Sequence, residues 1–207
     1  MRRIMSITLA TLGLVALSLS IAVAQDKKDQ KDPAAGAQAA RQPAAAAAQH
    51  QEPIITKMRV QDYKPVKYFY VETETTIAQM GATVPEQLPK IFAGIMEHSI
   101  QVNGPMIFVY HGVTQDREKP FKLEIGFPCG GDPKAEGDYK VRELAEYHCA
   151  SVIYSGPIAQ VATAYQSLFT ELFGAGLQPE GETREMYLYW ESPESHNNVQ
   201  VIMQGVK

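Results

Sequence analysis

The stretch Tyr154–Ser192, YSGPIAQVATAYQSLFTELFGAGLQPEGETREMYLYWES, decides the fold of this chain. Its first part places apolar residues at the i, i+3, i+4, i+7 spacing of a core-facing helix between positions 158 and 173. Pro157 suits the first helical position, because its missing N–H would be unpaired there in any case. Gly174 and Gly176 supply a left-handed stop. The segment therefore predicts a long amphipathic helix that packs on a sheet.

The strand predicted after this helix carries an unusual set of side chains. Because side chains alternate across a strand, two sets are expected on opposite faces. They are Glu185, Tyr187 and Tyr189 on one face and Met186, Leu188 and Trp190 on the other. A carboxylate in line with two tyrosines is unexpected on a face that a helix covers, so this face is where we predict the functional site.

The same order of elements occurs twice. Strand, helix, strand, strand is predicted over residues 67–128 and again over residues 147–205. The helix of the first module is expected at Pro85–Ile100, with Pro89 tolerated in its first turn. An additional strand is expected at Ile54–Tyr63. The predicted fold class is α+β: an antiparallel curved sheet with two helices on one side, flanking a central cleft about a pseudo-two-fold axis.

The alignment of the two modules places the carboxylate in one copy only. IFVYH at 107–111 aligns without a gap with MYLYW at 186–190. Phe108 then corresponds to Tyr187 and Met106 to Glu185, a difference of 79 positions (187 minus 108). The two-fold symmetry is thus expected to be broken at the candidate site.

The N-terminal segment is predicted to be a targeting signal. Arg2 and Arg3 precede an apolar run at 7–21, and Ala22-Val23-Ala24 gives an A-x-A cleavage site. Residues 1–24 are therefore predicted to be a signal peptide, which implies export to the periplasm or the exterior and no membrane insertion after cleavage. The alternative is an uncleaved N-terminal anchor, since about 18 apolar residues is the lower limit for spanning.

The rest of the chain divides into a linker and one domain. Residues 25–53 are rich in Ala, Gln and Pro and contain no aromatic residue, so they are predicted to be a disordered linker. Residues 54–207 are long enough for one domain with a sizeable core. The chain has a net charge of −4 and no basic cluster, so nucleic-acid binding is not expected.

Metal and cofactor chemistry find no support in the motifs. The five histidines show no metal-ligand spacing, and no glycine-rich phosphate loop or G-x-S-x-G motif occurs. We therefore predict neither a metal nor a cofactor. An oxidising compartment would permit a disulfide between Cys129 and Cys149. The register of the predicted hairpin would instead keep these residues apart, so both outcomes stay open.

Several segments, taken in order, resemble one known family. They are NGPMIFVYHG (103–112), FKLEIGFPCGG (121–131), YKVRELAEYHCASVIYSGP (139–157) and the helix leading to the strand around 185–187. Together they are similar to the GyrI-like small-molecule-binding domain, also known as the effector-binding domain of bacterial transcription activators. The resemblance implies the tandem fold and a cleft for apolar, often cationic, compounds. The acidic residue of the family's E-x-Y motif falls on Glu185, and its tyrosine falls on Tyr187.

The chain departs from this family in three respects, one of which is that Ala145-Glu146-Tyr147-His148 stands where a glycine or arginine is usual. A predicted export signal stands in place of a predicted DNA-binding domain, so the output of a regulator is not expected. The histidine that often precedes x-Gly-Pro in the family is replaced by Tyr154. Some relatives are hydrolases of small electrophilic compounds, so the resemblance leaves enzymatic activity open.

These observations predict an exported protein that holds an apolar or cationic small molecule in the cleft, with Glu185 as the carboxylate that faces the ligand. One alternative is a hydrolase in which Glu185 activates water and Tyr187 holds a carbonyl or epoxide oxygen. Another is an interaction domain whose cleft is closed by its own side chains. The sequence identifies neither the ligand, a protein partner nor the oligomeric state. The predicted ligand-binding residues are Glu185, Tyr187, Tyr110, Tyr154, Phe108 and Tyr189.

Overall fold

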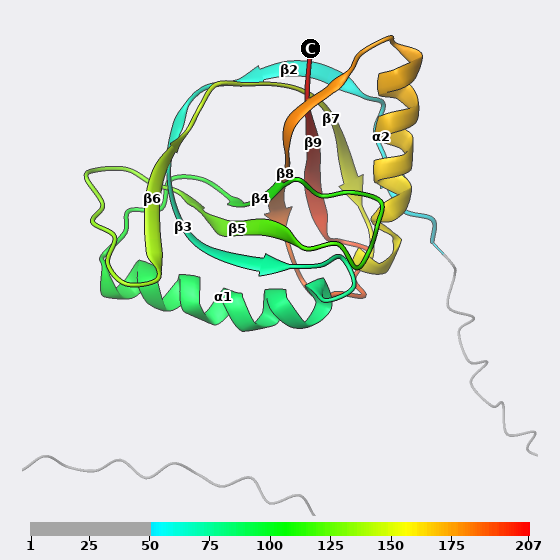
Figure 1. Cartoon of the computed structure of the whole chain (residues 1–207). Helices are drawn as coiled ribbons and strands as arrows, with labels where there is room; N and C mark the ends of the chain where they lie inside the picture. Colours follow the sequence, from blue (N-terminus) through cyan, green and yellow to red (C-terminus); the bar gives the residue numbers. More distant parts are fainter. Residues whose placement is uncertain (1–50) are drawn as a thin grey trace, which may run out of the picture. The chain divides into compact units, whose positions relative to one another are not determined.

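The structure is a computed structural model that describes residues 51–207 (Figure 1). The predicted signal peptide and all but the last three residues of the predicted linker lie outside the described residues. Residues 51–207 form nine strands, two α-helices and one short 3₁₀ helix. Their bounds are β1 Ile54–Ile55, β2 Arg59–Tyr63, β3 Val66–Thr75, α1 Met80–Glu97, β4 Met106–His111, β5 Phe121–Pro128, β6 Tyr139–Leu144, β7 Tyr147–Ser155, 3₁₀ Ile158–Gln160, α2 Ala162–Gly174, β8 Pro179–Tyr189 and β9 Val199–Val206.

The strands form one antiparallel sheet in the order β1-β7-β9-β8-β4-β5-β3-β6, with β2 also paired to β7. The modules β3-α1-β4-β5 and β7-α2-β8-β9 meet where β4 pairs with β8. Ile107 lies opposite Met186 in this pairing, and these residues differ by the same 79 positions (186 minus 107) that relate the modules. The pseudo-two-fold axis therefore passes between them, and the predicted fold class is confirmed.

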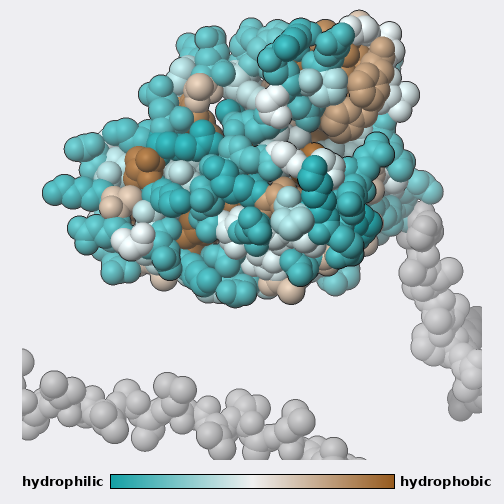
Figure 2. Space-filling model, in the orientation of Figure 1, coloured by the Kyte–Doolittle hydropathy of each residue, from teal (hydrophilic) through white to brown (hydrophobic). Residues whose placement is uncertain are grey.

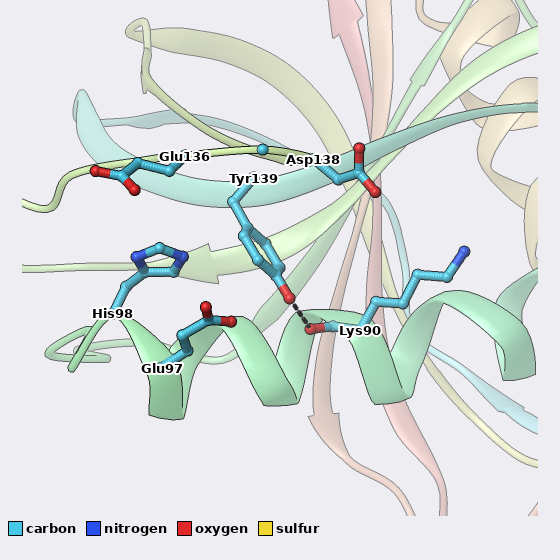
Figure 3. A pocket seen from close by; sticks show the side chains of 7 residues that line it. Lys90, Glu97, His98, Glu136, Asp138 and Tyr139 are labelled. Atoms are coloured by element: carbon cyan, nitrogen blue, oxygen red, sulfur yellow. Dashed lines mark hydrogen bonds between the residues drawn. The ribbon is translucent and has the colours of Figure 1, made fainter.

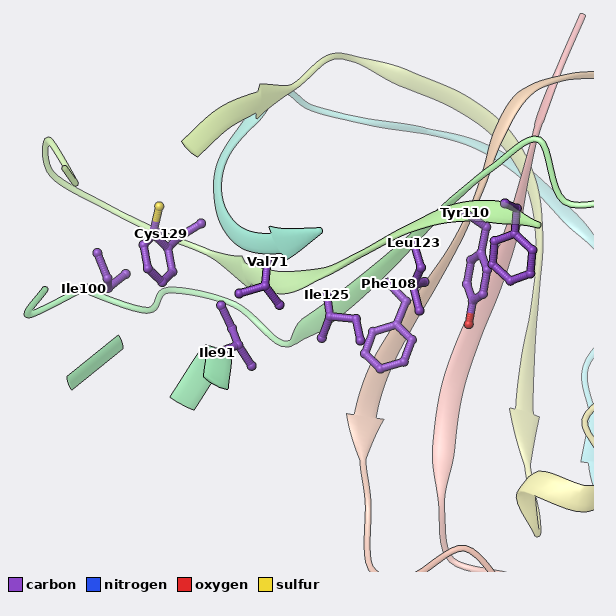
Figure 4. Close-up of a cluster of buried hydrophobic side chains, with 10 residues drawn as sticks. Val71, Ile91, Ile100, Phe108, Tyr110, Leu123, Ile125 and Cys129 are labelled. Carbon is purple, nitrogen blue, oxygen red and sulfur yellow. The ribbon is translucent and has the colours of Figure 1, made fainter. Parts of the chain in front are cut away.

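Both helices pack on the same face of the sheet. One cross-strand row on this face is Val152, Ile202, Glu185, Phe108, Ile125 and Val71. Leu168 of α2 packs in the cluster at the Val152 end of the row, and Ile91 of α1 packs in the cluster at the Val71 end. Figure 4 shows the α1 cluster extending from Ile100 and Cys129 to Tyr110, beside β8 and β9. The central residues of the row, Glu185 and Phe108, therefore lie between the two helices, as predicted.

The opposite face of the sheet is also largely buried, because the sheet is strongly curved (Figure 1). Its apolar residues form two clusters that include Tyr68, Val109, Cys149 and Met203. Among them runs a set of paired charges that we call the charge network. It consists of Glu124, Glu182, Arg142, Arg184 and His111.

Glu124 is the most buried member of the charge network, with a side chain 2% exposed. Arg142 donates from Nε and Nη2 to its Oε2 atom at 3.0 and 2.7 Å, and His111 Nε2 lies 2.9 Å from its Oε1 atom. Glu182 pairs with Arg184, Arg142 and His111. Since Glu124 belongs to the first module and Glu182 to the second, the network joins the two modules.

Helix α1 begins five residues earlier than predicted, at Met80. Pro85 and Pro89 consequently lie in its interior, so the prediction that Pro89 occupies the first turn was wrong. Both prolines are on the exposed side of the helix, four residues apart. The carbonyls that lose their N–H partners there face water, which reduces the cost of interior prolines.

The start of α2 also differs from the prediction. Pro157 has extended dihedrals, φ −66° and ψ 141°, and precedes a 3₁₀ turn rather than opening the α-helix. Two 3₁₀ hydrogen bonds, from the N–H groups of Gln160 and Val161, connect this turn to α2. Gly176, with φ +74°, confirms the predicted left-handed stop, whereas Gly174 is the last residue of the helix.

The two cysteines are free and lie buried in separate clusters, Cys129 beneath α1 and Cys149 on the opposite face. Burial raises the pKa of the Cys149 thiol to about 12.

The surface in Figure 2 is mostly hydrophilic, with hydrophobic residues gathered over α2, where Phe173 is exposed. Within residues 51–207, neither the length nor the hydropathy of any helix is sufficient for a membrane span.

Candidate functional site

The candidate site is a buried carboxylate that accepts three tyrosine hydrogen bonds. Glu185 is 4% exposed. The hydroxyls of Tyr110 and Tyr187 each donate to its Oε2 atom at 2.7 Å, and the hydroxyl of Tyr165 donates to Oε1 at 2.5 Å. We call these four residues the carboxylate–tyrosine site.

Both modules contribute residues to this site. Glu185 and Tyr187 lie two positions apart on β8 and therefore share a face. Tyr110 comes from β4, which pairs with β8, and Tyr165 reaches the sheet from α2. Met106 occupies the position in the first module that corresponds to Glu185. The site therefore lies beside the pseudo-two-fold axis, and the carboxylate occurs on one side of it only.

The carboxylate of the site has no basic partner among the described residues. Among residues 51–207, no Lys, Arg or His side chain forms an ion pair with Glu185. Burial, and then the negative charge of Glu185, raises the pKa of Tyr110, Tyr165 and Tyr187 well above the ordinary tyrosine value. The phenols therefore stay neutral, and each donates its hydrogen to the Glu185 carboxylate.

Alkaline conditions are expected to destabilise the fold through this site. An unfolded tyrosine ionises near pH 10, whereas these three have raised pKa values in the folded state. Their contribution to stability is present below pH 10 and is lost as the pH rises towards the folded pKa. Each such tyrosine should cost about 1.4 kcal/mol of unfolding free energy per pH unit above 10. Urea unfolding at pH 8, 10 and 11 measures this effect, and the Tyr110→Phe variant should show a shallower decline.

Aromatic rings extend from the carboxylate towards the surface. The Phe108 ring lies 4.7 Å from the Tyr187 ring, and the Trp190 ring meets Tyr187 edge-on at 6.0 Å. Trp190 is 43% exposed. Its expected position on the opposite face was wrong, because the register shifts between Tyr187 and Tyr189 and the strand ends there.

Four of the six predicted site residues come together: Glu185, Tyr187, Tyr110 and Phe108. Tyr154 is instead buried in the core beneath α2, where its hydroxyl donates to the Pro157 carbonyl at 2.6 Å. Tyr189 lies beyond the register shift and is 54% exposed. Sequence reasoning placed Tyr165 in the helix core stripe and did not include it in the site. The signal in the sequence was the hydroxyl of Tyr165, a polar group among the apolar side chains of the core-facing stripe.

A separate cavity of about 230 Å³ lies at the C-terminal end of α1 (Figure 3). Its lining residues are Lys90, Glu97, His98, Glu136, Gly137, Asp138 and Tyr139. Tyr139 donates from its hydroxyl to the Lys90 carbonyl at 3.2 Å. The cavity lies away from the candidate site, because β4, β5 and β3 lie between β8 and β6, the strand that begins at Tyr139. None of the predicted site residues lines the cavity. Across residues 51–207, no group of three or more His, Cys, Asp or Glu side chains is arranged to hold a metal ion.

Comparisons with known proteins agree with this architecture. The sequence model of the family described as "GyrI-like small molecule binding domain" matches residues 56–203. A search of curated protein sequences returned no significant match.

Solved structures with the same fold have low sequence identity to this chain. The EcmrR C-terminal domain is 17% identical, with a TM-score of 0.64 over 73% of this chain and 97% of that domain. The match spans only 57% of EcmrR in its DNA complex. SAV2435 bound to tetraphenylphosphonium is 13% identical, with a TM-score of 0.54 over 73% of this chain and 94% of that one. A hydrolase from Listeria innocua is 11% identical, with a TM-score of 0.50 over 73% and 92%.

Proposed function

This chain belongs to the GyrI-like small-molecule-binding domain family, and we propose that it binds a small apolar cation against Glu185, over the sheet between α1 and α2. The observation that carries the proposal is a buried carboxylate that accepts three tyrosine hydroxyls and has no basic partner among the described residues. A neighbour with the same fold has been solved with tetraphenylphosphonium bound.

The aromatic residues around Glu185 suit such a ligand. A cation gains about 0.5–2 kcal/mol from each well-placed aromatic face, in addition to its attraction to the carboxylate. Tyr187 and Phe108 provide rings at the sheet, and Trp190 extends this surface to solvent. We infer that the ligand enters from the Trp190 side and leaves the hydrogen bonds of Tyr110 in place, because Tyr110 is buried whereas Tyr187 is partly exposed.

The binding proposal is tested with the full chain and tetraphenylphosphonium. Isothermal titration should give saturable binding, and ligand at 100 times Kd should add about 2.7 kcal/mol to the unfolding free energy. A screen that also includes cationic dyes, quinones and small lactones covers the wider ligand class. If none of these compounds shifts the melting temperature, the proposal is wrong and the closed interaction domain is favoured, in agreement with the low exposure of Glu185.

A hydrolase is the second candidate. The observation that favours it is the presence of hydroxyl donors within hydrogen-bond reach of a carboxylate, as a general base and its partners require. In this case Glu185 activates water and Tyr187 holds a carbonyl or epoxide oxygen of the substrate. Turnover of small lactones or epoxides that is abolished in Glu185→Gln, with substrate affinity retained, would identify the enzyme.

We also propose that the protein is exported, on the basis of residues 1–24. Expression of the full chain in bacteria should yield a periplasmic or secreted protein whose N-terminus begins at Gln25. N-terminal mass spectrometry that finds Met1 in a membrane fraction would instead support the uncleaved anchor.

A further inference from the structure

Strand β9 places a buried amide beside the carboxylate–tyrosine site. Gln200 is 3% exposed and lies on the helix face of β9, which it shares with Ile202 and Gln204, the residues two and four positions further along. Its cross-strand neighbours are Tyr154 on β7 and Tyr187 on β8. Since the Tyr187 hydroxyl donates to Glu185, the Gln200 side chain adjoins the candidate site.

This amide differs from the second buried glutamine of the same strand. Within residues 51–207, Gln200 Nε2 is buried and has no hydrogen-bond partner. Gln204, four residues further along the same face, is fully engaged. It accepts from the Thr183 hydroxyl at 2.7 Å and donates to the carbonyls of Glu180 and Gly205 at 3.3 and 3.2 Å. A buried donor without a partner is costly, and native proteins rarely keep one without a purpose.

We propose that Gln200 is a specificity-determining residue of the ligand site, and that the natural ligand carries a hydrogen-bond acceptor in addition to its positive charge. This inference rests on the proposed function and specifies the class of ligand: a cation with a carbonyl, ether or similar oxygen. The side chain of Glu185 attracts the cationic centre, and the Nε2 group of Gln200 donates to the oxygen.

The sheet register sets the spacing between these two ligand groups. Glu185 pairs with Ile202, so Gln200 is the diagonal neighbour of Glu185 across the β8–β9 pair. Diagonal neighbours of this kind lie about 7–8 Å apart. A ligand that satisfies both residues therefore has its acceptor oxygen several ångströms from the positive centre, on the same rigid skeleton.

The experiment compares two cations that differ in one acceptor: tetraphenylphosphonium and its 4-acetylphenyl analogue. Binding to the full chain is measured by titration calorimetry for wild type, Gln200→Met and Gln204→Met. We expect wild type to bind the acetyl analogue about 3- to 10-fold more tightly, the worth of one neutral hydrogen bond. Gln200→Met should abolish this preference and leave the affinity for tetraphenylphosphonium within about 2-fold. Gln204→Met should keep the preference.

Thermal unfolding without ligand provides an independent measurement. Gln200→Met should melt at a temperature equal to or above that of wild type, because it removes a donor without a partner. Gln204→Met should melt lower, because it leaves the Thr183 hydroxyl unpaired.

Failure of this inference and failure of the proposed function give different results. Lack of tetraphenylphosphonium binding by wild type would overturn the cation site itself. Normal tetraphenylphosphonium binding with an acetyl preference that survives in Gln200→Met would overturn only the role of Gln200. A large loss of stability, or failure to fold, in Gln200→Met would also overturn it, since the amide would then have a structural partner.

Discussion

Glu185→Gln is expected to weaken the binding of tetraphenylphosphonium about 100-fold. The substitution keeps the shape of the side chain and removes its charge. Two opposite unit charges about 5 Å apart attract each other by about 3 kcal/mol at an effective dielectric constant of about 20. Since tenfold in affinity corresponds to about 1.4 kcal/mol, loss of this attraction predicts the 100-fold effect. Titration calorimetry with wild type and variant measures it directly.

Two controls separate the role of this carboxylate from general effects. Triphenylphosphine oxide, a neutral compound of similar shape, should lose less than about 3-fold in affinity. Glu180→Gln, which removes an exposed carboxylate from the same strand, should bind the cation as wild type does. Unchanged cation affinity in Glu185→Gln, together with an unaffected Tyr187→Phe, would place the functional site elsewhere in the chain.

The hydrogen bonds of Glu185 determine the expected unfolding free energy of the Glu185→Gln variant. An isolated buried carboxylate would be costly, and its removal would preserve or raise stability. Glu185 is not isolated, because Tyr110, Tyr165 and Tyr187 donate to it. A glutamine amide has one acceptor oxygen, so at least one phenol loses its acceptor. We therefore expect the unfolding free energy of Glu185→Gln to fall by about 1–3 kcal/mol.

Glu124→Gln should be among the most destabilising polar substitutions, with a loss of about 3 kcal/mol in unfolding free energy. Glu124 has almost no exposure and accepts two hydrogen bonds from Arg142. Removal of one partner from a buried ion pair leaves the other charge uncompensated, at a cost of about 3–5 kcal/mol. The lower end applies because Arg142 is 29% exposed and keeps Glu182 at 3.6 Å. Urea unfolding at pH 7 measures the change.

Glu72 provides the matched control for this substitution. It lies directly opposite Glu124 in the β3–β5 pair and also carries lysine partners, but its side chain is 27% exposed. Hydrogen bonding to Lys140 lowers its pKa, yet an exposed pair of this kind contributes less than about 1 kcal/mol. Equal losses in Glu72→Gln and Glu124→Gln would contradict the central role of the charge network.

The repeat and the strand alternation predicted most of the fold and the centre of the site. The common offset of Phe108 and Tyr187 predicted two modules related by a pseudo-two-fold axis. The alternation along β8 predicted that Glu185 and Tyr187 share a face with the helices. Tyr154 shows the limit of that reasoning. It lies on the same face, but the sheet order places β9 between it and β8. The face on which a side chain lies therefore did not determine its distance from the Glu185 carboxylate.

The remaining features depend on information that a single strand or helix does not contain. Tyr165 occupied an ordinary core position of its helix, and its bond to Glu185 depends on how α2 crosses β8. The charge network joins residues of β4, β5, β6 and β8, so only the complete register brings Glu124 and Arg142 together. The Trp190 ring contacts the Tyr187 ring because the register of β8 shifts between Tyr187 and Tyr189, and no local sequence pattern indicated this shift.

The pairing of β4 with β8 has a consequence for the newly made chain. The first module is synthesised as one contiguous segment, and until β8 arrives its β4 edge presents unpaired N–H and C=O groups. Exposed strand edges of this kind favour association with other chains during biogenesis. Closure of the β4–β8 pair protects this edge and, in the same event, brings Tyr110 to Glu185. The step that removes the aggregation hazard is therefore also the step that assembles the carboxylate–tyrosine site.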